Sequence, residues 1–213
     1  MNLIATTLVL ALAAAKPAKA PPAAGPFNAE DYRLYCGWLT EVTKDENKGL
    51  SKDKQVGKVA KLAKVKPAQL KAVVDKGDKA GGDCAAIAKQ MEDKARGALA
   101  GTPLEKRLES LQLDTEDPSH VVAYVAWKGD QEKLLEEEAS LLVFTVMNEA
   151  PIVTTLSVRA VDPKDGETAL FEGKIAADNV GRIQKERINS FADSMYIKWF
   201  DGVVWANPAA HKR

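Results

Sequence analysis

The stretch HVVAYVAW, residues 120–127, decides the fold of this chain. It is rich in β-branched and aromatic residues and lies between Pro118 and the polar turn at 128–130, so we expect a β-strand. Farther along the chain, leucines and valines recur at helical spacing until Pro151 ends the pattern, which predicts a helix. A strand followed directly by a helix begins a β-α-β unit.

Two more strands follow this helix. The segment 152–161 alternates apolar and polar residues, which is typical of a half-buried strand. The tetrapeptide PKDG at 163–166 predicts a turn, and 169–175 then reads as the returning strand. The two strands therefore form a predicted hairpin.

A second helical pattern begins at Asp178 and reaches Met195. The short apolar run 203–205 predicts a last, short strand. The order over 119–206 is strand, helix, strand, strand, helix and short strand, which matches a split β-α-β arrangement. We therefore predict an α+β protein in which an N-terminal helical region precedes a β-α-β-β-α-(β) ferredoxin-like sandwich.

Two segments of this domain stay ambiguous. The run LLVFTVM at 141–147 fits either a strand or the end of a helix. The run at 196–205 also fits a hairpin about Asp201-Gly202, because Asp-Gly between β-forming residues is a strong hairpin signal.

The segment 28–113 predicts a series of helices. Their starts and breaks are marked by capping residues, prolines and glycines. These markers are Asn28, Gly49, Ser51, Pro67, Gly81-Gly82, Asp83 and Gly101. The sharpest local signal is the capping box at 102–105, TPLE, which predicts a last helix with Leu104, Leu108 and Leu111 on one side.

The N-terminus predicts export. Residues 3–15 are almost wholly apolar, which is too short for a membrane span and fits the core of a secretory signal peptide over 1–15. Residues 16–27 form a Pro/Ala-rich linker that cannot continue a helix. The alternative is a buried N-terminal helix of a cytosolic protein. Export predicts a periplasmic or secreted location.

The two cysteines, Cys36 and Cys84, are the whole cysteine complement of the chain. In an exported protein an even count predicts a disulfide. The bridge would close a loop of about 49 residues and contribute ~4 kcal/mol in the chain-entropy model. The alternative is a pair of unrelated buried thiols.

Charge is distributed unevenly although 30 basic residues balance 30 acidic ones. Residues 41–96 hold 14 basic and 9 acidic side chains, whereas 105–149 hold 4 basic and 11 acidic. Four lysines lie together on the polar face of one predicted helix and form a candidate contact for an anionic partner. They are Lys54, Lys58, Lys61 and Lys64.

The basic helix has three readings. The simplest is a solvated helix surface. A second is contact with an anionic envelope polymer, a lipid surface or an acidic protein surface, for which the acidic segment 130–138 is a candidate. The third is a helix-turn-helix in which Gln69 and Lys71 face a DNA major groove. Lysine rather than arginine dominates the segment, which disfavours nucleic acid as the partner.

No complete catalytic, metal-binding or cofactor-binding signature occurs. The segment 166–174 ends in Gly-Lys but has the wrong spacing for a phosphate-binding loop, and no dinucleotide-binding glycine pattern is present. His120 reads as a surface residue at a strand edge. The acids at 114–117 and 162–167 miss the spacing of calcium loops and suit turns. We therefore predict no cofactor, metal site or catalytic residue.

Function is expected to lie in surfaces. The aromatic residues gather near Cys36 and at 196–205, where core packing is the first reading and a ligand groove the second. We expect an exported, non-enzymatic cell-envelope binding or assembly module. The alternatives are an envelope hydrolase that uses carboxylate or metal-assisted chemistry, and a cytosolic helix-turn-helix protein that binds DNA.

Overall fold

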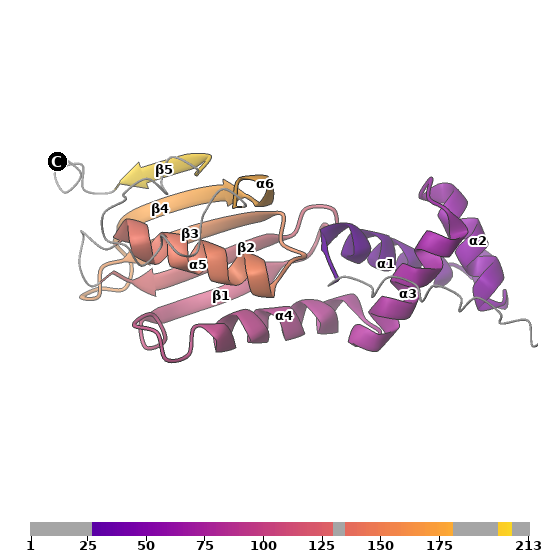
Figure 1. Cartoon of the computed structure of the whole chain (residues 1–213), viewed down its shortest axis with the longest axis horizontal. Coiled ribbons are helices and arrows are strands. Elements are labelled where there is room, and N and C mark those ends of the chain that lie inside the picture. The colour runs from indigo at the N-terminus through magenta and orange to yellow at the C-terminus, as the bar shows by residue number, and fades with distance from the viewer. Residues whose placement is uncertain (1–26, 130–134, 181–199, 206–213) are drawn as a thin grey trace, which may run out of the picture.

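The computed structural model describes residues 27–129, 135–180 and 200–205 (Figure 1). A helical region is followed by a five-stranded mixed sheet with an interleaved helix, so the α+β class is confirmed. The elements are α1 (Ala29–Val42), a 3-10 turn (Asp45–Asn47), α2 (Lys52–Leu62), α3 (Pro67–Ala80), α4 (Cys84–Ala98), β1 (Leu108–Asp114), β2 (Val122–Lys128), α5 (Leu135–Glu149), β3 (Thr155–Val161), β4 (Ala169–Ala176), α6 (Ala177–Val180) and β5 (Gly202–Trp205).

The predicted helix starts are confirmed where the structure gives their caps. Asn28 accepts a hydrogen bond from the backbone N–H of Asp31 at the start of α1, and Asp83 accepts one from Ala86 at the start of α4. Each bond satisfies a backbone donor that the first helical turn leaves free. Pro67 is the first residue of α3, where its missing N–H costs nothing.

The strands lie in the order β1-β2-β3-β4-β5. β2 and β3 are parallel and are joined through α5, whereas the other neighbours are antiparallel. The ferredoxin-like topology is not confirmed, because β2 and β3 are direct neighbours and a split β-α-β unit would place a strand between them.

The prediction of a last helix before residue 113 is wrong, because Leu108–Asp114 forms strand β1. The box at 102–105 makes a turn: the Glu105 carboxylate accepts from the backbone N–H of Gly101, and the helical pattern does not continue. Residues from Ser110 to Asp114 instead pair with β2. Sheet pairing with β2 thus overrides the local helix signal.

The two ambiguous segments are partly resolved. Residues 141–147 belong to helix α5. β5 begins at Gly202 and pairs with β4, while the first arm of the alternative hairpin, 196–199, lies outside the described residues. Of the helix predicted over 178–195, the described part is α6.

Helices α4 and α5 pack side by side against the sheet (Figure 1). Beneath them lie buried residues of the strands, including Leu111, Trp127 and Phe171. The Arg96 guanidinium and the Glu92 carboxylate of α4 also bond to backbone groups of β1, at 3.0 and 3.4 Å. One side of the sheet is therefore built into the core, and the outer edge of β1 is partly covered.

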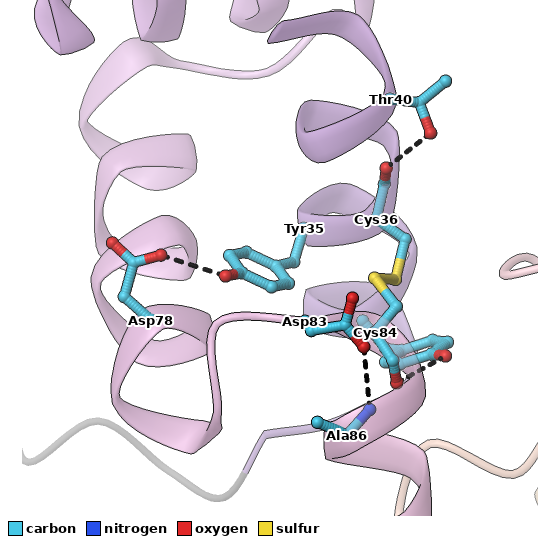
Figure 2. The surroundings of a disulfide bond; sticks show 8 residues. Tyr35, Cys36, Thr40, Asp78, Asp83, Cys84 and Ala86 are labelled. Atoms are coloured by element: carbon cyan, nitrogen blue, oxygen red, sulfur yellow. Dashed lines mark hydrogen bonds between the residues drawn. A yellow bond between two sulfur atoms is a disulfide. The ribbon is translucent and has the colours of Figure 1, made fainter. Parts of the chain in front are cut away.

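A disulfide joins Cys36 on α1 to Cys84 on α4, as predicted (Figure 2). Beside it the buried ring of Tyr35 points toward α3, where its hydroxyl donates to Asp78 at 2.9 Å. Burial, together with the neighbouring Asp78 carboxylate, raises the pKa of Tyr35 above its usual range. The Cys36–Cys84 bridge thus links α1 to α4, and α4 in turn packs on the sheet.

Candidate functional site

The face of the sheet opposite α4 and α5 carries no helix among the described residues and is the first candidate site. We call it the open sheet face. Side chains alternate along each strand, so every second residue of β1–β5 points to it. Its residues are Ser110, Gln112, Tyr124, Ala126, Ser157, Arg159, Glu172, Lys174 and Val204.

A hollow of about 410 Å³ lies across this face. Small side chains at Ser110, Ala126 and Ser157 form part of its lining. Tyr124, whose partner in the sheet register is Ser157, is 49% exposed, and Val204 is 63% exposed. A large aromatic and a large aliphatic side chain therefore stand beside a depression that a partner can fill.

The charges of the open sheet face are mixed, with an excess of cations in the hollow. The Arg159 guanidinium lies 3.3 Å from the Glu172 carboxylate and donates to the backbone carbonyl of Glu167 at 2.8 Å. Lys174 is exposed and has no ion-pair partner among the residues that the structure describes. One uncompensated cation thus remains beside the hollow.

The four predicted anionic-partner lysines lie on α2 and in the turn that follows it. Lys54, Lys61 and Lys64 are exposed and have no ion pair within the described ranges. Lys58 is engaged: it donates to Asn47 at 2.7 Å and to the Glu46 carboxylate at 3.1 Å. Three of the four lysines are therefore available to an external anion.

An exposed leucine beside these lysines was missed by sequence reasoning. Leu62, the last residue of α2, is 60% exposed, although the apolar face of the helix is buried at Val56, Val59 and Ala60. Leu62 follows Ala60 by two residues, so the helical period already placed it away from the buried face.

The two helices that the helix-turn-helix hypothesis requires are present as α2 and α3. Gln69 and Lys71 are exposed on α3, and Lys71 lies 3.9 Å from both Asp53 and Asp75. The turn between the helices contains Lys64 in the left-handed backbone region, with φ of 57°. DNA binding stays a prediction.

The aromatic clusters divide between core and surface. Tyr32, Tyr35 and Trp38 are buried, so they pack in the core instead of lining a groove. Phe200 packs edge-on against Phe171 at 6.2 Å between ring centroids. Of the other residues in the C-terminal cluster, 196 and 199 lie outside the described residues. Tyr124, which the sequence placed in a strand but not in a site, is the exposed aromatic of the open sheet face.

The polar groups weighed for catalysis serve the local structure. His120 is exposed just before β2, with Nδ1 3.4 Å from the Thr154 hydroxyl. Asp114, Asp117 and Asp162 each accept a backbone N–H two residues later, which is turn chemistry. No group of three or more potential metal ligands occurs among the described residues.

One carboxylate is buried within the described part of the chain, and it belongs to the acidic segment 130–138. Glu138 is 8% exposed and accepts hydrogen bonds from Trp127 and Arg107. It is committed to the interior and is not an external partner for the lysines. Residues 130–134 lie outside the described residues.

None of the described helices is both long enough and apolar enough to span a membrane. Comparison of the chain with family models, curated proteins and solved structures finds no match.

Proposed function

We propose that the protein is an exported, non-enzymatic cell-envelope module that binds an acidic protein surface on its open sheet face. The observation that carries the proposal is the hollow beside Tyr124. Aromatic residues are enriched in the cores of protein interfaces because they bury much area with few rotatable bonds. A half-exposed tyrosine over small neighbours suits that role.

The shape and the charge of the face support the same partner. The small side chains at Ser110, Ala126 and Ser157 let a partner approach the strands closely. Lys174 supplies a cation that has no ion-pair partner in the part of the chain that the structure describes, so a carboxylate of the partner would gain an ion pair there. Glu172 is already occupied by Arg159, which reduces its repulsion of an acidic partner.

Export is supported by two independent features. Residues 3–15 have the length and composition of a signal-peptide core. The Cys36–Cys84 disulfide is typical of oxidising compartments outside the cytosol. Intact mass of the protein from its native cells tests this part: we expect loss of a leader of about fifteen residues and of two hydrogens at the bridge. A full-length, reduced chain would contradict it.

Site-specific photo-crosslinking tests the binding surface. A benzophenone amino acid is placed at Tyr124, and a control is placed at Lys94, which is exposed on α4. After illumination of native cells we expect a discrete adduct from position 124 and none from 94. Lys174→Glu in the same chain should weaken the adduct. Equal adducts at both positions, or none at 124, would contradict the proposal.

A further inference from the structure

A second surface lies far from the open sheet face. Helix α2 and the turn to α3 form the end of the molecule that is remote from the sheet (Figure 1). We call this surface the basic tip and define it by its exposed residues. They are Lys54, Lys61, Leu62, Lys64 and Lys66.

The lysines of the basic tip have no ion-pair partner within the described ranges. From residue 54 to residue 66 the chain holds five lysines and no acidic residue. Of these five lysines, Lys58 is outside the basic tip and pairs with Glu46, the one ion pair that the described residues give them. The neighbouring Lys52 forms an ion pair with Asp78 of α3 at 2.7 Å. This carboxylate therefore neutralises a lysine beside the basic tip and not one of its members. The tip therefore attracts an anion.

The exposed leucine identifies the kind of anion. Leu62 lies between Lys61 and Lys64 in the chain and is 60% exposed, so most of its apolar surface is in contact with water. A soluble polyanion would engage the lysines and leave Leu62 in water. A lipid surface would engage both, because leucine can enter the acyl boundary while lysine side chains extend to the headgroups.

We propose that the basic tip docks on a membrane surface that carries anionic lipid headgroups, with Leu62 inserted into the interface. The lysines supply the electrostatic attraction, and the leucine supplies the apolar contact. Because the sheet lies at the other end of the molecule, docking leaves the open sheet face free for a protein partner (Figure 1). The docking does not depend on the proposed function.

Vesicle co-sedimentation of the full chain tests the proposal. The probes are vesicles of equal parts phosphatidylglycerol and phosphatidylcholine, and vesicles of phosphatidylcholine alone. Residues 3–15 could bind either vesicle if the leader is present, so the measured quantity is the difference between the two. We expect a clear preference for the anionic vesicles that decreases as salt is raised.

Two variants separate the charge from the leucine. Lys61→Gln with Lys64→Gln should weaken the anionic preference roughly 25-fold, at about fivefold for each lysine near an anionic surface. Leu62→Ser should weaken binding to the anionic vesicles about tenfold and leave the salt dependence of that binding unchanged. The charge-matched control Lys79→Gln with Lys94→Gln changes two exposed lysines elsewhere and should stay within about twofold of wild type.

The outcomes distinguish a lipid surface from a soluble polyanion. Binding to dextran sulfate should be weakened by the lysine variant and unchanged by Leu62→Ser. If Leu62→Ser binds anionic vesicles as well as wild type does, the tip recognises charge alone and the lipid proposal is overturned. Equal binding to both vesicle types would also overturn it. Matching circular dichroism and melting temperatures confirm that the variants fold.

Discussion

Trp127 on β2 donates its indole N–H to the Glu138 carboxylate on α5 at 2.8 Å, inside the layer between helix and sheet. The second oxygen of Glu138 accepts from the guanidinium of Arg107, which lies in the turn before β1. One buried carboxylate thus connects a central strand, the crossover helix and the edge of the sheet. Each of its two donors would be left without this acceptor if the carboxylate were removed.

Glu138→Ala should therefore destabilise the protein by about 3 kcal/mol, because it leaves a partly buried cation and a buried indole N–H unpaired. The measurement is the free energy of unfolding by urea. Glu109→Ala is the matched control, since it breaks the exposed Glu109–Lys128 pair between β1 and β2, and should cost about 0.5 kcal/mol. Equal losses would show that the Glu138 contacts contribute no more than a surface ion pair.

Reduction of the Cys36–Cys84 bridge should lower the free energy of unfolding by ~4 kcal/mol. The two residues are 48 apart in sequence, so the bridge restricts a long loop in the unfolded chain. Urea unfolding with and without reductant measures the loss. The Cys36→Ala, Cys84→Ala double variant is the control and should show no response to reductant. A wild-type chain that is equally insensitive would contradict the stabilising role of the bridge.

Local signals predicted the helical region well and the sheet incompletely. The caps at Asn28 and Asp83 use side chains within three residues of their targets, so the sequence carries that information directly. The strand Leu108–Asp114 is different, because Leu104, Leu108 and Leu111 also fit a helix. Its conformation is determined by pairing with β2, which lies farther along the chain.

The two candidate surfaces also differ in how far local sequence predicts them. Lys54, Lys58 and Lys61 could be placed on one helix face from their spacing alone, whereas Lys64 lies in the turn that follows α2. The exposure of Tyr124 could not, because both faces of a strand alternate in sequence and the choice of the open one depends on where α4 and α5 pack. The spacing of the sequence therefore grouped most of the lysines near the basic tip, but it located neither the exposed Leu62 nor the open sheet face.

Two helical glycines should respond in opposite ways to the same substitution. An added Cβ at Gly77 in α3 would lie 2.3 Å from the ring of Tyr35, which is fully buried and cannot move aside. An added Cβ at Gly57 in α2 meets nothing within 4 Å. Gly77→Ala should thus cost about 2–3 kcal/mol through overpacking. Gly57→Ala should stabilise the helix by up to about 1 kcal/mol.

Urea unfolding of the two glycine variants checks this pair. The backbone preference for alanine over glycine is the same at both positions, so the difference between the variants isolates the contact with Tyr35. If Gly77→Ala were as stable as Gly57→Ala, the close packing of α3 against α1 would be contradicted.

The carboxyl group of Asp165, in the turn between β3 and β4, is unusually acidic. The hydroxyl of Thr168 donates to Asp165 at 2.6 Å, and the backbone N–H groups of Glu167 and Thr168 donate at 2.9 Å each. These bonds favour the ionised form and lower the pKa of Asp165 to about 2. The folded-state pKa lies below the usual 3.8, so this carboxylate stabilises the fold above that pH and loses its contribution as pH falls toward 2.

Thr168→Val removes the hydroxyl, the largest cause of the shift, and should raise the pKa of Asp165 toward 3.8. Thr168→Ser keeps a hydroxyl and should leave the pKa near 2. The measurement is an NMR titration of the Asp165 carboxyl carbon. Because the Thr168 side chain is exposed, the substitution changes no core contact, and a shift in the pKa of Asp165 reports on the turn alone. Identical titrations of the valine and serine variants would show that the backbone donors, and not the hydroxyl, hold the carboxylate in its ionised form.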